Sequence, residues 1–245
     1  MAIYHLRLGM VQRSKGQSVV AVAADRARVW LRDERLDQVM APLPAKRGTA
    51  PVFSEVLLPD GAPERFRDRG TLWNAVEAGE RQRNSQLARE VEFALPWELM
   101  QGQAVALACA YVRTAFVADG MMADLNVHWA VRDDGQLKPY AQVLLTCRRF
   151  GSGGFGPKEI AWNNRALALA WRRLWAEMAN ACLAMHGHAA RIDHRSHAER
   201  GIPVEPQNKI GPNAARRARR GQGSERVDEH AAIARRNAEQ AVQPE

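Results

Sequence analysis

The chain has 245 residues, of which 46% are apolar and 25% are charged, a composition typical of a folded globular protein rather than a disordered or fibrous one. Lysine and arginine number 35 against 27 acidic residues, so the formal charge is +8, which favours a polyanionic partner, most commonly nucleic acid. The three cysteines have no CxxC spacing, which argues against a disulfide framework and a zinc ribbon. The length indicates one large domain, or one domain with an appendage.

No apolar run approaches the length of a membrane span. The longest uninterrupted run covers only residues 104–112, whereas about 20 residues are needed to cross a bilayer. The basic residues near the N-terminus are not followed by the apolar segment of a secretion signal. We therefore expect a cytoplasmic protein without a membrane span, whose basic excess binds an anion inside the cell.

The first part of the chain predicts strands and helices in alternation. Residues 2–8 mix β-branched, aromatic and polar side chains and predict a strand. Ser18 can cap a helix, and the spacing of apolar residues after it predicts that this helix runs to about Arg35. Residues 52–58 predict a second strand, and a second helix is expected from about Pro63.

The next segment carries an acidic pair on a predicted strand. Residues 88–95 alternate apolar and polar side chains, so Glu90 and Glu92 share one face, about 7 Å apart. Pro96 ends this strand and begins a helix that we expect to reach about Val117.

The clearest antiparallel pair of the chain follows. Residues 124–131 and 139–147 flank residues 132–136, whose Asp-Gly pair is typical of a tight hairpin. A glycine-rich stretch at 151–156 lacks the Lys-Ser/Thr of a phosphate-binding loop, so we predict no nucleotide site there. A long amphipathic helix ended by Gly187 comes next, with Trp162, Trp171 and Trp175 expected as packing residues.

The composition changes beyond Pro203. Residues 209–226 contain six basic side chains against one acid and almost no bulky apolar residue, so they cannot form a core. The six are Lys209, Arg216, Arg217, Arg219, Arg220 and Arg226. Residues 227–242 are Ala-rich and predict an exposed helix that orders on a partner. We therefore predict an α+β domain over 1–205, with a central antiparallel sheet flanked by helices, and a basic, partly helical or disordered tail over 206–245.

Five short pieces of the sequence occur in a fixed order between residues 2 and 213. They are Ala2-Ile-Tyr-His-Leu6, Arg13-Ser-Lys-Gly-Gln-Ser18, Leu87-Ala-Arg-Glu-Val-Glu-Phe-Ala-Leu-Pro96, Val127-His128, and His188-Ala-Ala-Arg-Ile-Asp-His-Arg-Ser196 with Ile210-Gly-Pro-Asn213. As a set they resemble the MobA/MobL relaxases of plasmid mobilisation, HUH-type enzymes related to the TraA conjugation proteins.

The resemblance implies a relaxase fold and its chemistry. In that family a divalent metal, Mg²⁺ or Mn²⁺, is held on the sheet by three histidines, where it neutralises and aligns a phosphate. A tyrosine on the first helix attacks a phosphodiester at the origin of transfer and stays attached to the 5′ end. The implied partners are single-stranded or origin-of-transfer DNA and other mobilisation proteins.

The chain departs from the family pattern at the residues that carry this chemistry. The family's Pro-His-x-His is Pro139-Tyr140-Ala141-Gln142 here, so of three ligands only His128 matches. The family's Ala-Ala-Tyr-Arg is Ala23-Ala24-Asp25-Arg26, with Asp25 at the nucleophile position. A phenol is protonated at neutral pH and a carboxamide is a weak neutral donor. We therefore expect the metal to bind weakly or not at all, and nicking to be impaired.

Other interpretations of these positions stay open. Asp25 could attack phosphorus, but an acyl phosphate is too labile for a lasting DNA adduct. Tyr140 could be a relocated nucleophile or could fill the space of a lost ligand, whereas Tyr4 and Tyr111 are expected to pack in the core. The alternative function is thus an active metal-dependent relaxase with its ligands and nucleophile elsewhere.

Two further groups have a structural and a functional interpretation. Glu90 and Glu92 match the acidic pair beside the family's active site and could support a metal or nucleophile, or serve the fold. Four histidines suggest either a separate zinc site or a helix cap and a loop facing DNA. They are His186, His188, His194 and His197.

Two sets of basic residues suit a phosphate backbone. The first lies along the first predicted helix, as Arg26, Arg28, Arg32 and Arg35; its alternative is a solvated helix face. The second is the tail set of Lys209, Arg216, Arg217, Arg219 and Arg220, which could instead bind RNA or an acidic protein. The leading hypothesis is a relaxase-like DNA-binding protein of plasmid mobilisation or conjugative transfer with impaired cleavage.

Overall fold

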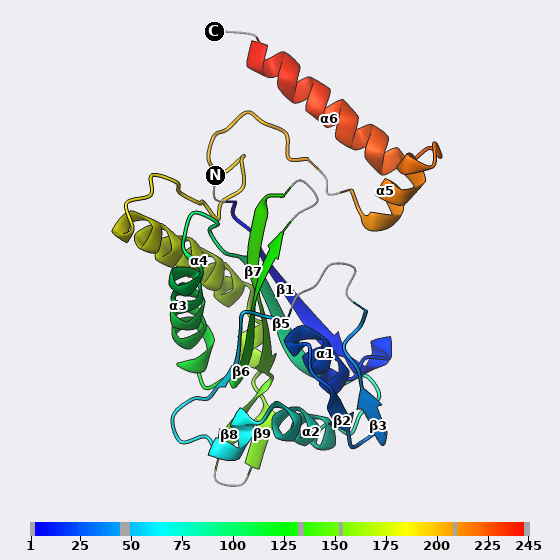
Figure 1. Cartoon of the computed structure of the whole chain (residues 1–245), viewed down its shortest axis with the longest axis vertical. Helices are drawn as coiled ribbons and strands as arrows, with labels where there is room; N and C mark the ends of the chain where they lie inside the picture. The colour runs from blue at the N-terminus through cyan, green and yellow to red at the C-terminus, as the bar shows by residue number, and fades with distance from the viewer. Residues whose placement is uncertain (1–2, 45–49, 132–134, 152–153, 208–209, 243–245) are drawn as a thin grey trace. The chain divides into compact units, whose positions relative to one another are not determined.

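The computed structural model describes residues 3–44, 50–131, 135–151, 154–207 and 210–242 (Figure 1). The chain forms two compact units, Met1–Asp193 and His194–Glu245. The functional division that we expected between residues 205 and 206 stays a prediction. Within the described ranges, no helix combines the length and the apolar character that crossing a membrane requires.

A five-stranded antiparallel sheet forms the centre of the first unit, in the order β1-β5-β7-β6-β4. The strands are β1 (Leu6–Gln12), β4 (Phe53–Leu57), β5 (Gln86–Ala94), β6 (Ala123–Val131) and β7 (Leu137–Thr146). Helices cover both faces, so the predicted α+β class with a flanked antiparallel sheet is confirmed.

The two faces of the sheet carry separate hydrophobic cores. Helices α3 (Gln101–Val112) and α4 (Arg165–Met185) pack on one face, against strand residues such as Val91 and Phe93. The predicted packing residues Trp162, Trp171 and Trp175 are buried in this core. Helices α1 (Val19–Ala27) and α2 (Arg69–Gly79) pack on the other face. Because side chains alternate along a strand, Glu90 and Glu92 face the α1 side.

The first helix is shorter than predicted. Ser18 caps α1 by accepting a hydrogen bond from the N–H of Ala21, as expected. The helix ends at Ala27, because Arg28 adopts a left-handed conformation with φ 58°. Residues that we expected to extend the helix to Arg35 instead form a hairpin of β2 (Leu31–Asp33) and β3 (Gln38–Met40). The β-branched and aromatic pair Val29-Trp30 favours this extended backbone.

Other boundaries also differ from the predictions. The first strand lies at Leu6–Gln12 rather than 2–8, and a 3-10 turn at Arg13–Lys15 follows it. The second helix begins after Asp68, which accepts from the N–H of Thr71, and residues Glu64–Arg67 form a separate 3-10 turn.

The third helix and the glycine-rich stretch also differ from the predictions. The third helix begins at Gln101 rather than at Pro96, and its last turn, Arg113–Val117, is a π-helix. The glycine-rich stretch contributes to a hairpin of β8 (Arg148–Gly151) and β9 (Gly154–Lys158). A helical pattern read from side-chain spacing cannot locate such turns, because backbone hydrogen bonds decide them.

The predicted hairpin between β6 and β7 is present. His128 lies opposite Tyr140 and Asn126 lies opposite Gln142 in the register of this pair. Residues 132–134 of the expected turn lie outside the described residues, and Gly135 has φ 80°.

The second unit contains α5 (Pro212–Arg219) and α6 (Glu225–Val242). The guanidinium of Arg236 donates to both carboxylate oxygens of Glu205, at 2.8 and 2.9 Å, and Ile233 is buried. The helix that we predicted for residues 227–242 is present as α6, beginning slightly earlier, and many of its side chains are exposed. That it orders on a partner stays a prediction.

Candidate functional site

Adjacent strands and the end of α1 bring the predicted positions together. His128 on β6 faces Tyr140 on β7, and Gln142, two residues further along β7, lies opposite Glu92 on β5. The end of α1 lies against the same face of the sheet, because the imidazole of His128 hydrogen-bonds to the backbone of Arg26. We call this group the sheet site. It comprises Asp25, Arg26, Glu90, Glu92, His128, Tyr140 and Gln142.

His128 retains the features of a ligand. Its side chain is 6% exposed, and its ring stacks on that of Tyr140 with 4.9 Å between centroids and 14° between planes. Burial lowers the pKa of His128, and the nearby charges of Arg28 and Arg26 lower it further. Among the described residues, no hydrogen-bond partner approaches its buried Nε2. A neutral imidazole with an unoccupied nitrogen can accept a proton or coordinate a cation.

Tyr140 has the wrong protonation for a nucleophile or a strong ligand. It is half-buried, and burial followed by the charge of Glu92 raises its pKa above 10.0. The other two tyrosines lie in the core as predicted. Tyr111 is fully buried and donates to the carbonyl of Trp171 at 3.0 Å, and Tyr4 is partly buried against the same core. Burial raises the pKa of both.

The carboxamide of Gln142 is hydrogen-bonded to an acidic neighbour. Its Nε2 donates to Oε2 of Glu92 at 3.0 Å. The other oxygen of Glu92 lies 3.5 Å from Nε2 of His5. The contact with His5 is the largest cause that lowers the pKa of Glu92, and the hydrogen bond from Gln142 adds to it. Burial opposes this shift, and the resulting pKa is about 2. Glu92 therefore remains ionised at neutral pH.

Asp25, at the family's nucleophile position, connects the end of α1 to a later segment. Its Oδ1 accepts from the guanidinium of Arg28 at 3.3 Å and from the N–H of Leu43 at 3.0 Å. Arg28 also donates to the carbonyl of Leu43, at 2.6 Å. Arg26 pairs with Glu90. The carboxylate of Asp25 thus has a structural role that the sequence did not indicate.

The residues present do not fit the family's metal. His128 Nε2 is the one suitable donor at the three ligand positions, since the Tyr140 phenol is protonated and Gln142 binds Glu92. Across the described ranges, no group of three or more His, Cys, Asp or Glu side chains could hold a metal ion. The zinc interpretation of the four later histidines therefore has no support there. His186 is the C-cap residue of α4 through its backbone N–H, whereas its imidazole Nδ1 lies 2.9 Å from Nε2 of Gln103 rather than on a helix carbonyl.

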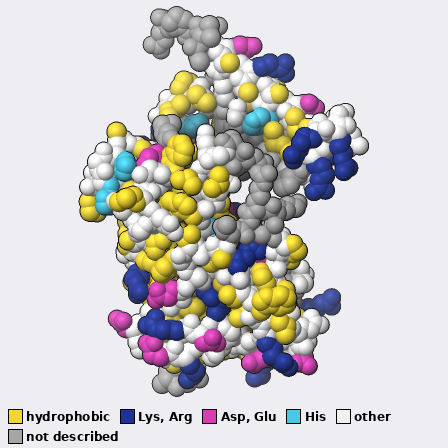
Figure 2. All heavy atoms as spheres, in the orientation of Figure 1, with side chains coloured by type: hydrophobic (Ala, Val, Ile, Leu, Met, Phe, Trp, Pro, Cys, Tyr) yellow, Lys and Arg dark blue, Asp and Glu magenta, His cyan; other side chains and the backbone are white. Residues whose placement is uncertain are grey.

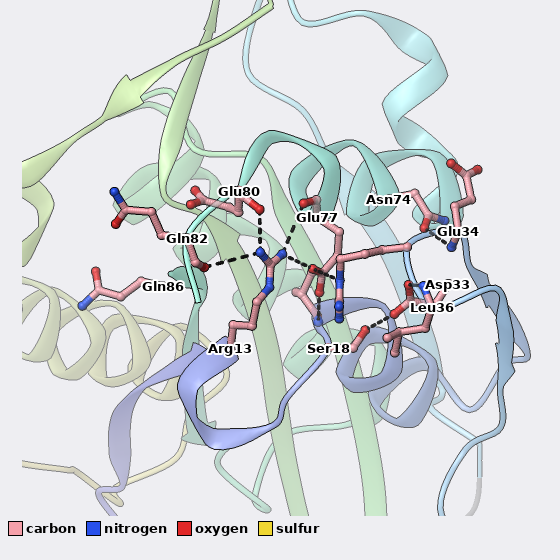
Figure 3. A network of polar contacts seen from close by, with 12 residues as sticks. Arg13, Ser18, Asp33, Glu34, Leu36, Asn74, Glu77, Glu80, Gln82 and Gln86 are labelled. Atoms are coloured by element: carbon pink, nitrogen blue, oxygen red, sulfur yellow. Dashed lines mark hydrogen bonds and ion pairs between the residues drawn. The ribbon is translucent and has the colours of Figure 1, made fainter. Parts of the chain in front are cut away.

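A buried polar network holds the other end of α1 (Figure 3). The Oε1 of Glu77 accepts from the N–H of Val19 at 2.8 Å, and its Oε2 accepts from Arg13 and Arg35. Glu77 is almost completely buried on α2, and sequence analysis missed it. Its position directly after the apolar Val76 in an amphipathic helix was the available signal. Arg35, expected on a helix, instead lies in the β2–β3 turn and binds this carboxylate.

The predicted phosphate-binding residues lie on several different elements. Arg26 is on α1, Arg28 is its C-cap, and Arg32 is on β2, where its exposed guanidinium pairs with Asp37. In the second unit, exposed arginines lie on α5 and at its end, and Figure 2 shows Lys and Arg side chains gathered there. These are Arg216, Arg217, Arg219 and Arg220. Lys209 lies outside the described residues.

Comparison with known proteins identifies the family. A family model described as MobA/MobL family matches residues 17–220. The chain belongs to the MobA/MobL family. It is 38% identical over 246 aligned residues to the mobilization protein MobL of Acidithiobacillus ferridurans, covering 88% of this chain and 63% of that protein. It is 31% identical to the conjugal transfer protein TraA of Rhizobium radiobacter, covering 87% of this chain and 22% of that protein.

This MobA/MobL chain therefore spans less than two thirds of the length of these relatives. Among solved structures, one titled "Molecular Basis of Vancomycin Resistance Transfer in Staphylococcus aureus" matches with a TM-score of 0.72 and 29% identity, over 80% of this chain and 100% of that chain. The conjugative relaxase TrwC, solved with metal and oriT DNA, matches with a TM-score of 0.52 and 11% identity, over 94% of this chain and 98% of that chain. The fold is thus that of a relaxase.

Proposed function

We propose that this MobA/MobL protein binds single-stranded DNA at an origin of transfer during plasmid mobilisation or conjugation, in the cytoplasm, without cutting the strand at the family's site. Relatives are named mobilization and conjugal transfer proteins, and TrwC was solved with oriT DNA. The observation that carries the loss of cleavage is the sheet site itself, where His128 is the one remaining suitable ligand.

The position of Asp25 supports this proposal. Its carboxylate accepts hydrogen bonds from Arg28 and from the backbone of Leu43, so it is not poised to attack phosphorus. An aspartyl phosphate would also hydrolyse too readily to preserve a DNA adduct. The metal of the family is expected to bind weakly or not at all, because His128 is the one suitable donor at its three ligand positions. Other mobilisation proteins would then supply the cleavage.

An active relaxase with a relocated nucleophile is the second candidate function. The buried Nε2 of His128, which has no hydrogen-bond partner among the described residues, and the nearby acids Glu90 and Glu92 favour it, since they could still assist proton transfer. The tyrosines weigh against it, because burial raises the pKa of all three: Tyr4, Tyr111 and Tyr140. A phenol kept protonated in this way is a poor nucleophile.

A cleavage assay separates the two candidates. The protein is incubated with a single-stranded origin oligonucleotide and Mn²⁺ or Mg²⁺, and denaturing gels are examined for cut strand and covalent adduct. We expect neither product, and any metal-dependent product would overturn the loss of cleavage. The combined variant Asp25→Tyr, Tyr140→His and Gln142→His is the matched gain-of-function control. We expect it to restore some cleavage, because it returns the three missing groups to the sheet site.

A salt titration tests the DNA-binding part of the proposal. Affinity for single-stranded DNA should fall linearly on a logarithmic scale as salt rises, with a slope of about 0.7 per phosphate contact. Alanine at the four exposed arginines of α5 and its end should make this slope shallower. An affinity without salt dependence would contradict phosphate binding. Preferential binding of RNA or of an acidic protein would assign the second unit a different partner.

A further inference from the structure

An exposed tryptophan lies directly beyond the end of α1. The side chain of Trp30 is 69% exposed, whereas Trp73, Trp162, Trp171 and Trp175 are buried. Three other large apolar side chains of the following hairpin and loop are also exposed: Leu36 at 40%, Val39 at 59% and Leu43 at 68%. Single apolar side chains on a surface are ordinary, but a group that includes a tryptophan marks a binding surface.

The local fold explains why Trp30 faces outward. Leu31 and Asp33 point inward from β2, so the alternation of the strand turns Arg32 outward, opposite Val39 on β3. Trp30 lies two residues before Arg32, so its side chain points to the same outward side. The N–H of Leu43 donates to Asp25 and its carbonyl accepts from Arg28, and these two bonds fasten the loop after β3 to the end of α1. We call Arg28, Trp30, Arg32, Val39 and Leu43 the α1-end patch.

The α1-end patch combines an apolar surface with positive charge. Figure 2 shows hydrophobic side chains gathered over α1 and the segment after it, with Lys and Arg side chains beside them. Arg32 pairs with Asp37, but both side chains are largely exposed, and such a surface pair contributes little. A phosphate can therefore compete for this guanidinium. Charge complementarity favours a polyanion with flat apolar faces over an apolar protein surface.

The α1-end patch borders the sheet site. Arg28 belongs to the patch, and it also contacts Asp25 in the sheet site. Arg26, two residues before Arg28, hydrogen-bonds through its backbone to the imidazole of His128, which holds this end of α1 against the sheet site. A strand bound at the sheet site could therefore continue over Arg28 to Trp30.

We propose that Trp30 is a stacking platform for a base of single-stranded DNA, and that Arg28 and Arg32 bind the adjoining phosphates. The inference rests on the proposed DNA binding and adds the position where bases are held. Stacking suits this role because every base has an apolar π-face, and it requires no particular sequence. Aromatic side chains flanked by basic ones are the usual means of holding a single strand.

The experiment compares normal and abasic strands. Binding of a fluorescent oligo(dT) of about 20 nucleotides, and of an abasic backbone of equal length, is measured by anisotropy, since a single-strand site covers about 4–16 nucleotides. Trp30→Ala should lose about tenfold in affinity for oligo(dT), the low end of stacking effects. Trp30→Phe should keep most of the affinity. Leu169→Ala, an exposed site on α4 across the sheet, should change nothing.

The abasic strand makes the test specific. Without bases to stack, the wild type and Trp30→Ala should bind it equally, whereas an equal loss on both strands would overturn stacking. Unchanged oligo(dT) binding by Trp30→Ala would also overturn it, and a change in self-association alone would assign the patch to a second copy of the chain. If the wild type binds no single strand at all, the proposed function fails together with this inference. Circular dichroism confirms that each variant is folded.

Discussion

The two ends of α1 differ in how deeply their charged residues are buried and in whether every buried polar group there has a partner. At the N-terminal end, both carboxylate oxygens of the buried Glu77 accept hydrogen bonds, from the helix backbone and from two arginines. At the C-terminal end, charged side chains are partly exposed, and the buried Nε2 of His128 has no partner among the described residues. The comparison separates polar groups that hold the fold from polar groups that the fold leaves available to a ligand.

The largest expected effect is at the N-terminal end. Glu77→Gln leaves Arg13 and Arg35 without their shared anion inside the protein, so we expect the free energy of unfolding to fall by about 3 kcal/mol. Urea denaturation followed by circular dichroism measures the change. Glu64→Gln removes an exposed ion pair with Arg67 and serves as the control, with no measurable loss expected. Equal behaviour of the two variants would refute the structural role of Glu77.

A smaller effect is expected at the helix cap. Ser18→Ala removes the acceptor for the N–H of Ala21 and the donor to the buried Asp33. We expect a loss of roughly 1 kcal/mol in unfolding free energy. Asp25→Asn at the opposite end keeps an acceptor for the N–H of Leu43, so its change should stay within about 0.5 kcal/mol. A larger loss for Asp25→Asn than for Ser18→Ala would reverse the comparison of the two ends.

The smallest effect concerns the pH dependence of stability. The pKa of His128 in the folded protein is below 6.5, chiefly because of burial, so the unfolded chain takes up this proton first as the pH falls. Stability must therefore rise with pH between the lowered pKa and 6.5, and it is lost as the pH falls through this window. His128→Gln should show a smaller difference between urea midpoints at about pH 7.5 and pH 5. An unchanged difference would show that His128 does not titrate in this way.

Much of the sheet site could be predicted from the sequence. The Asp-Gly turn and the alternation of β6 and β7 were sufficient to pair these strands, and the pairing brings His128 opposite Tyr140. The alternation of β5 correctly placed Glu90 and Glu92 on the face opposite Val91 and Phe93. These features follow from a period of two residues, which is local in the chain.

The end of α1 could not be predicted in the same way. Apolar spacing continued past Ala27, so it indicated a helix as far as Arg35. The left-handed Arg28 and the distant partner Leu43 decide where this helix stops. The role of Glu77 depends on Val19, Arg13 and Arg35, which are separated from it in the chain and meet only after the helices pack.

The amino-acid sequence by itself determined the family, the antiparallel sheet and the residue types at the three ligand positions and the nucleophile position. Only the tertiary structure decided that Asp25 and Gln142 are engaged by neighbours, that His128 Nε2 has no partner in the described part of the chain, and that Trp30 is exposed. The physical reason is that residue identity and side-chain periodicity are properties of the local sequence. Burial and hydrogen-bond partnership exist only between segments that folding brings together.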